Sequence, residues 1–97
     1  MHLILPHKFT QAEATVRVKR VLSDTKPQLE GKATIEEERW EGNILHFAFT
    51  AQGQNVTGQL EVRDNEFVLD ATLPLVLRMF EGRIEKMIAE QSKQMLG

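Results

Sequence analysis

Three histidines are the first residues to consider for chemistry, because imidazole binds metal ions and transfers protons near neutral pH. They stand at His2, His7 and His46, and no two of them have the spacing that places metal ligands on one turn of a helix. A metal site would require the two N-terminal imidazoles and a distant one to converge. Surface or helix-capping roles account for all three more simply, so we expect no bound metal.

Carboxylates crowd into one short stretch, at Glu36, Glu37, Glu38 and Glu41. Paired carboxylates can act as general acid and base when both reach the same substrate. If this stretch is a strand, however, successive side chains point to opposite faces, and the set is divided. A solvated strand edge is the simpler interpretation, since charges on an edge strand prevent aggregation.

The other residue types with catalytic potential do not form a set either. There is no cysteine, which excludes disulfides, thiol catalysis and cysteine-ligated metal. Ser23 and Ser92 fall near expected helix ends, away from any candidate base. Gly53 and Gly58 lie in a predicted hairpin, without the helix that a phosphate-binding loop needs. We therefore expect no catalytic residue and no cofactor, and predict that the protein is not an enzyme.

The charge pattern argues against nucleic acid as a partner. Twelve Lys and Arg residues are interspersed with 14 Asp and Glu, for a net charge of −2. Such a chain has no basic stripe to neutralise phosphates. Aromatic residues can stack on bases, but without basic neighbours they are better interpreted as core. The aromatic residues in question are Trp40, Phe47, Phe49 and Phe67.

Alternating apolar and polar residues predict three strands of an antiparallel sheet that is wet on one face. They are Ile44–Thr50, Val56–Arg63 and Glu66–Leu73. Gly42-Asn43 and Asp64-Asn65 tolerate positive φ and suit two-residue turns, whereas residues 52–54 predict a looser loop.

Two further strands are predicted with less periodicity to support them. Ala33–Trp40 leads directly into the first turn, which favours a strand, although its run of charges would also fit a helix. Leu3–Leu5 is apolar and stopped by Pro6, which is typical of an edge strand.

Two helices are expected to cover the apolar face of this sheet. Thr10-Gln11-Ala12-Glu13 is a capping box and predicts a helix that runs to about Ser23, followed by a loop around Pro27 and Gly31. Pro74 suits the first position of a second helix of about 22 residues, which would span roughly 33 Å at 1.5 Å per residue. Gly82 is a weak point in it and indicates close approach to the sheet. One apolar stripe is expected along this helix: Leu73, Val76, Leu77, Phe80, Ile84, Met87, Ile88, Gln91 and Met95.

Together these elements predict a two-layer α+β fold, with an antiparallel sheet of four or five strands and two helices packed on one face. The 97 residues, 41% hydrophobic and 27% charged, fit a single α+β domain over 1–97. No run approaches the roughly 18 apolar residues of a membrane span, and the apolar run at Met1–Leu5 is too short for a signal peptide. We expect a cytoplasmic protein.

The order of these segments resembles one protein family along nearly the whole chain: the polyhydroxyalkanoic acid system proteins, also labelled granule regulators. No single motif carries the resemblance; the order and spacing together do. Pro74 and the longer loop around Gly31 depart from the family pattern, at element boundaries. The segments that resemble the family are Pro6-His7-Lys8-Phe9, Gln11-Ala12-Glu13-Ala14, residues 39–47, 56–62 and 67–73, and Phe80-Glu81-Gly82-Arg83-Ile84-Glu85-Lys86-Met87-Ile88.

The resemblance implies a role in the formation or regulation of bacterial polyester granules, with no catalytic residues to carry over. The leading hypothesis is a non-catalytic accessory protein of polyhydroxyalkanoate storage. Its partners would be the granule surface or granule-coating proteins, or a second copy in a homodimer. The alternative is a carrier of the helix-grip type, which would bind an acyl or other hydrophobic ligand between helix and sheet. An interaction module unrelated to polyester is a third class.

A contact surface is predicted at the end of the last helix. A strand of eight or nine residues spans about 27–30 Å, so the final turns of a 33 Å helix should extend past the sheet. Ile88, Gln91, Met95 and Leu96 would then form a seam for another helix or an apolar surface. The competing interpretation is that the helix frays after about Gln91.

Overall fold

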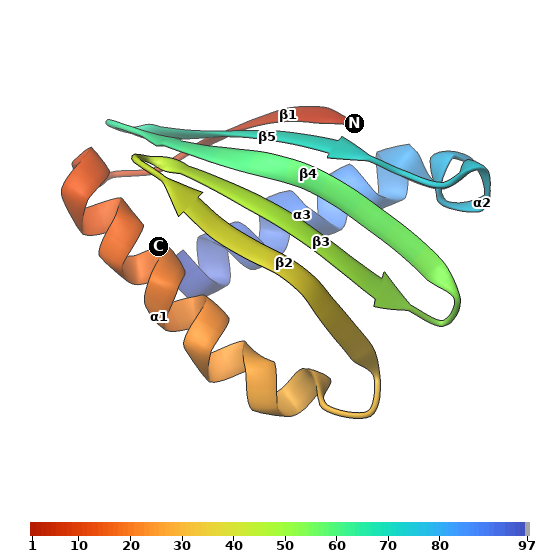
Figure 1. Cartoon of the computed structure of the whole chain (residues 1–97). Helices are drawn as coiled ribbons and strands as arrows, with labels where there is room; N and C mark the ends of the chain where they lie inside the picture. The colour runs from red at the N-terminus through yellow and green to blue at the C-terminus, as the bar shows by residue number, and fades with distance from the viewer. Residues whose placement is uncertain (97) are drawn as a thin grey trace.

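The computed structural model describes the backbone of residues 1–96 and the side chains of residues 1–94 (Figure 1). Five strands and three helices follow one another along the chain. In order they are β1 (His2–Pro6), α1 (Gln11–Leu29), β2 (Ala33–Glu41), β3 (Ile44–Ala51), β4 (Gln54–Arg63), β5 (Glu66–Thr72), α2 (Leu75–Arg78) and α3 (Glu81–Leu96).

The five strands form one antiparallel sheet in the order β1-β5-β4-β3-β2. Strands β2 to β5 are a meander, and β1 adds to its far edge by pairing with β5. Apolar residues lie opposite one another across the strands, as in the row Leu3, Leu69, Leu60 and Leu45. All five predicted strands are therefore confirmed, including the charged one before Gly42.

The turns follow local backbone chemistry. Gly42 and Asn65 adopt positive φ, at 60° and 64°, in the two turns that were predicted to be tight. The loop at Gln52 and Gly53 was expected to be looser, and this was wrong. Both residues have positive φ, as a two-residue hairpin of the type I′ kind requires.

Helix α1 begins as predicted but continues past its predicted end. The Thr10 hydroxyl accepts the Glu13 N–H at 3.2 Å, as a helix cap should. The helix then runs to Leu29, with Pro27 inside it, instead of stopping near Ser23. One ion pair links the extension to β2, where Lys26 Nζ lies 2.9 Å from Glu38 Oε1.

The predicted C-terminal helix is divided in two, which corrects the prediction of one continuous helix from Pro74. Pro74 is the N-cap of the four-residue α2, and Met79 and Phe80 separate α2 from α3. The Phe80 N–H donates to the carbonyl of Leu77, three residues back, at 3.0 Å. This tighter turn breaks the α-helical hydrogen-bond ladder.

Gly82 does not mark a close approach to the sheet, because a Cβ atom built there would have no neighbour within 4 Å. The close approach lies at Gly58 in β4 instead. A Cβ atom at Gly58 would collide with the Asp70 carbonyl oxygen and would lie 2.8 Å from Ala71 Cα. The absence of a side chain at Gly58 thus lets β4 and β5 pack at this point.

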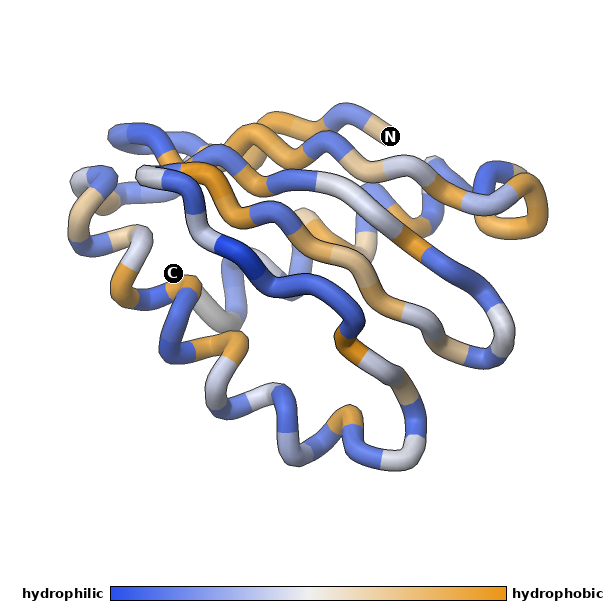
Figure 2. The backbone as a smooth tube through the Cα atoms, viewed as in Figure 1, coloured by the Kyte–Doolittle hydropathy of each residue, from blue (hydrophilic) through white to orange (hydrophobic). Residues whose placement is uncertain are grey.

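Helices α1 and α3 cover the same face of the sheet, and the opposite face is open (Figure 1). Between the layers lies a core cluster made of β-strand and α1 residues: Leu5, Ala14, Val18, Val62 and Phe67. A second cluster of Val56, Ala71 and Leu73 lies nearer to α2. Figure 2 shows hydrophobic and hydrophilic residues alternating along the strands, as a half-buried sheet requires. The two-layer α+β fold is confirmed, with five strands and with a third, short helix. No helix in residues 1–96 is long and apolar enough to cross a membrane.

Candidate contact surface on the second and third helices

The three histidines are each bonded within the fold, and no two of them share a partner. His2 Nδ1 lies 2.5 Å from Asp70 Oδ1, and His46 Nε2 lies 3.2 Å from Glu41 Oε1. His7 accepts the Phe9 N–H at Nδ1, so its Nε2–H donates to the Arg63 carbonyl at 2.9 Å. Among the described residues, no three His, Asp or Glu side chains gather as a metal site would require.

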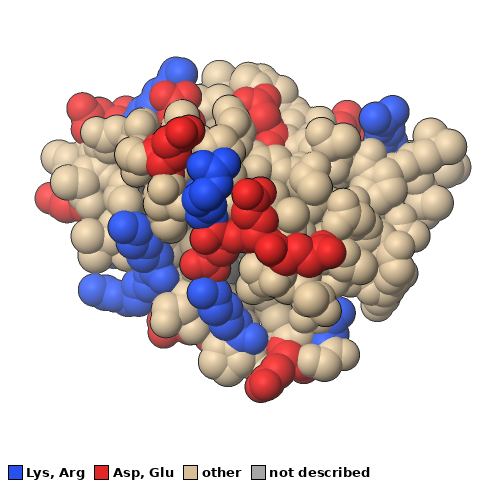
Figure 3. Space-filling view, viewed as in Figure 1, with Lys and Arg blue, Asp and Glu red and all other residues tan. Residues whose placement is uncertain are grey.

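The acidic residues of β2 have separate partners. Glu36 accepts hydrogen bonds from Thr50 and Asn55 at 2.7 and 2.9 Å. Glu38 lies opposite Phe47, on the face that the helices cover, and pairs with Lys26. A register shift between Ile35 and Glu37 accompanies this arrangement. Figure 3 shows acidic side chains gathered over β2 with basic ones beside them over α1.

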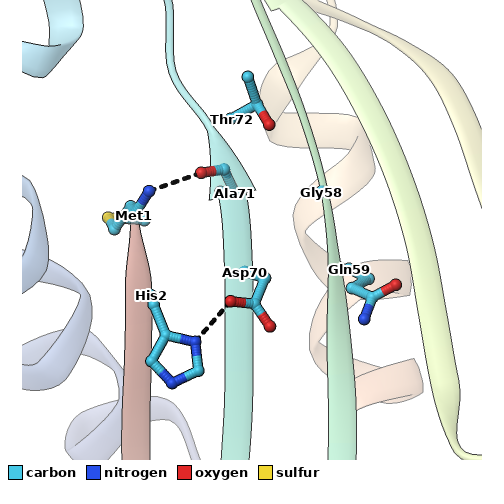
Figure 4. Close-up of a pocket in the computed structure, with 7 residues that line it drawn as sticks. All are labelled: Met1, His2, Gly58, Gln59, Asp70, Ala71 and Thr72. Carbon is cyan, nitrogen blue, oxygen red and sulfur yellow. Dashed lines mark hydrogen bonds and ion pairs between the residues drawn. The ribbon is translucent and has the colours of Figure 1, made fainter.

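A hollow of about 520 Å³ lies over the ends of β1, β5 and β4 (Figure 4). Its polar groups are already engaged with one another: the Met1 amino group donates to the Ala71 carbonyl at 2.7 Å, and His2 faces Asp70. The imidazole and the carboxylate are 61% and 47% exposed, so water competes with their interaction. An exposed ion pair on a sheet surface is the simplest account of this hollow.

The residues predicted to form a contact surface do not share one environment. Ile88 is partly buried and packs against the core cluster that contains Val18 and Phe67. Gln91 is exposed. Met95 and Leu96 belong to α3, but their side chains lie outside the described residues. The contact role of this helix end stays a prediction.

A larger apolar surface lies at the other end of the same segment, on α2 and the first half of α3. We call it the α2–α3 apolar surface. Its members are exposed to about half or more of their area: Leu75 (76%), Val76 (54%), Met79 (78%), Phe80 (48%) and Met87 (56%). Beside them is a groove of about 690 Å³ lined by Leu77, Phe80, Arg83, Ile84, Lys86, Met87 and Glu90.

Three of these residues had been assigned to the buried stripe, and that assignment was wrong. Leu77, Ile84 and Ile88 are the ones that pack against the core. Val76, Phe80 and Met87 face outward. Val76 and Met87 each precede a packed residue by one position, whereas Phe80 lies in the turn between α2 and α3. The sequence contained a signal for this difference, because the predicted stripe has more apolar positions than the roughly 100° face that one sheet can cover.

Comparison with known proteins agrees with the resemblance noted in the sequence. The family model described as "Putative polyhydroxyalkanoic acid system protein" matches residues 1–96. The chain belongs to this family. No curated protein and no solved structure gives a significant match. Family membership therefore links the chain to the polyhydroxyalkanoic acid system, and the α2–α3 apolar surface is the feature of the fold that a partner could use.

Proposed function

We propose that the protein is a non-catalytic accessory protein of bacterial polyhydroxyalkanoate storage. It acts in the cytoplasm by contact with the granule surface or with a protein that coats it. Family membership supports the setting. The observation that supports contact is the set of five large apolar side chains left exposed on α2 and α3.

The environment of the polar residues favours contact over catalysis. The imidazoles and the acidic side chains of β2 are bonded to partners inside the fold. A catalytic group usually stands in a cleft that excludes water and perturbs its pKa. The α2–α3 apolar surface has the opposite chemistry, since it is open, hydrocarbon-rich and suited to association.

Fractionation of polymer-producing cells tests this proposal. We expect the chain to sediment with isolated granules and to move to the soluble fraction in a strain that cannot make polymer. A cytosolic protein of similar mass, carried through the same gradient, controls for trapping. A chain that stays soluble in the presence of granules would refute the proposed function.

The carrier hypothesis keeps one supporting observation. Phe47 and Phe49 are only partly buried, although they belong to the face that the helices cover. Helices α1 and α3 diverge toward the end of β3 that carries these rings (Figure 1). Titration with 3-hydroxyacyl or fatty-acyl ligands, followed by fluorescence of Trp40, tests this second function. A carrier requires saturable binding together with a raised melting temperature.

A further inference from the structure

The α2–α3 apolar surface is a projecting feature of the molecule. Helix α2 lies beyond the end of the sheet (Figure 1), and the hydropathy colours mark it as hydrophobic (Figure 2). The helix is anchored to the core at two positions. Leu73, just before α2, is 5% exposed, and Leu77 in α2 packs against the second core cluster. Leu75 and Met79 are therefore displayed outward from a fixed support.

The outward residues come from three consecutive segments: Leu75 and Val76 in α2, Met79 and Phe80 in the turn that follows, and Met87 in α3. Phe80 and Met87 also line the same groove, which connects the turn to α3. An amphipathic segment that lies on an apolar surface buries one apolar face and keeps basic side chains at the rim. The surface extends over two helices, and it therefore exceeds what α2 alone could offer.

The rim of this surface carries hydrogen-bond donors. Arg83 and Lys86 are exposed, and neither takes part in an ion pair among the described residues. Arg78 uses its Nε to donate to the Leu73 carbonyl at 3.1 Å, which leaves its other guanidinium nitrogens available. Glu81 is paired with the Met1 amino group at 3.3 Å, and Glu90 lies in the lining of the same groove, so the rim carries both signs of charge.

We propose that the α2–α3 apolar surface binds bare aliphatic polyester, a proposal that rests on the function proposed above. Such a polymer offers hydrocarbon and ester carbonyl oxygens, which accept hydrogen bonds but cannot donate them. Exposed apolar side chains match the hydrocarbon, and the cationic donors of Arg83 and Lys86 match the carbonyls. Met79 and Met87 add adaptability, because flexible thioether chains can follow a surface with no fixed shape.

Two other occupants fit the observations less well. An anionic lipid surface gains little attraction from a rim on which Arg83 and Lys86 lie beside Glu90. A second copy would need about 800 Å² from each partner for a standard interface. The five exposed side chains supply only several hundred Å², the range in which apolar patches on monomers are often functional.

The test is sedimentation of the purified full chain with amorphous poly(3-hydroxybutyrate) particles that are free of lipid and protein. The test variant is the double substitution Leu75→Ser and Met79→Ser. The control is Ile4→Ser with Val16→Ser, which changes two exposed apolar residues on other elements, 54% and 56% exposed against 76% and 78% for Leu75 and Met79. Circular dichroism and thermal melting verify that both variants keep the fold.

We expect the test variant to bind polyester at least about tenfold more weakly than the wild type. The reason is that the variant lacks the two apolar side chains that binding would transfer from water to the polymer surface. The control variant should bind polyester within about twofold of the wild-type affinity. A chain that lacks the end of α3 should also bind within about twofold of that affinity. Arg83→Ala with Lys86→Ala should weaken binding by a smaller factor. Neutral phosphatidylcholine vesicles should retain less protein than the polyester does.

Equal binding by the test variant and the wild type would overturn the inference, as would an equal loss in the control. So would sedimentation velocity that shows a wild-type dimer and a monomeric test variant, because the surface would then serve self-association. Failure of the chain to reach native granules in cells refutes the proposed function itself. If the chain sediments with native granules but does not bind bare polymer, only the inference of direct polyester binding is refuted. The partner is then a protein that coats the granule.

Discussion

Strands β4 and β5 and the α2–α3 segment are similarly rich in apolar residues, but they use them in opposite ways. Val62 and Phe67 in the sheet are 0% and 1% exposed. Phe80 and Met79, between the two helices, are 48% and 78% exposed. Residue type alone therefore does not determine burial. What differs is the neighbour: β4 and β5 lie at the middle of the sheet with helices across one face, whereas α2 projects past the sheet's end.

The geometry of each element explains the contrast. A strand presents its apolar residues on one face, so a single covering layer buries all of them. A helix buries only the stripe that faces its support. In α2 and α3 that stripe is occupied by Leu77, Ile84 and Ile88, and the remaining apolar residues are left outside.

The same substitution in the two regions should give the largest difference in stability. Phe67→Ala removes a ring from the centre of the core cluster and should cost about 3–5 kcal/mol of unfolding free energy. Phe80→Ala removes a ring that is half in water and should cost less than about 1 kcal/mol. Urea denaturation followed by circular dichroism measures both. Similar losses for the two variants would mean that the burial contrast does not exist in solution.

Glycine substitutions sharpen the comparison, because they should have opposite signs. Gly58→Ala forces a methyl group against the Asp70 carbonyl and Ala71, and should destabilise the sheet by about 1–3 kcal/mol. Gly82→Ala has open space and should stabilise α3 by up to about 1 kcal/mol. Thermal unfolding of the two variants against the wild type decides this. A destabilised Gly82→Ala protein would place α3 closer to the sheet than described.

The start of α1 offers a smaller effect. Thr10→Ala deletes the hydroxyl that accepts the Glu13 N–H, and should cost about 1 kcal/mol. Thr57→Ala, on the exposed face of β4, serves as the control and should stay within about 0.5 kcal/mol. The midpoint of denaturant unfolding reports both. If the two losses agreed, the cap would contribute nothing beyond ordinary surface effects.

Truncation after Glu90 should have the smallest effect and separates two contact surfaces on one helix. The shortened chain keeps Ile88 and the entire α2–α3 apolar surface. We expect it to melt within a few degrees of the full chain and to keep its affinity for polyester. Loss of self-association or of granule partitioning would instead support the seam of Ile88, Gln91, Met95 and Leu96 at the end of α3. Sizing chromatography and granule sedimentation give the answer.

Much of the fold could be predicted because local patterns and tertiary packing agree in the sheet. Period-2 alternation indicated β3, β4 and β5 to within a few residues, and the resemblance to the family was confirmed. The end of α1 could not be predicted, since Pro27 disfavours a helix at this point and the ion pair of Lys26 with Glu38 on β2 is a tertiary contact. The division of the C-terminal helix near Met79 could not be predicted either. The segment has more apolar residues than one helix face can bury, and their spacing does not show which of them pack inward.

The contact surface predicted at the end of α3 stays a prediction, and the α2–α3 apolar surface is a separate feature that helix length did not indicate. Helix length suggested an overhang near Gln91, whereas the exposed apolar residues gather near Leu75 and Met79. Their burial depends on where the sheet ends beneath the helix, and that boundary is a tertiary property. Local spacing cannot supply it.

The pairing of β1 with β5 has a consequence for the order of folding. Each hairpin of the meander pairs strands that are neighbours in sequence. Strand β1 pairs with the distant β5, so that Leu3 lies opposite Leu69. Closing so long a loop costs entropy before any contact is made, and such contacts form late and slow the folding reaction. We expect the meander to acquire protected amides first and β1 last. Pulse-labelled hydrogen exchange in which β1 is protected as early as β3 and β4 would contradict this order. Until β1 docks, β5 presents an unpaired edge, and a freshly synthesised chain is then most open to joining a neighbouring copy strand to strand.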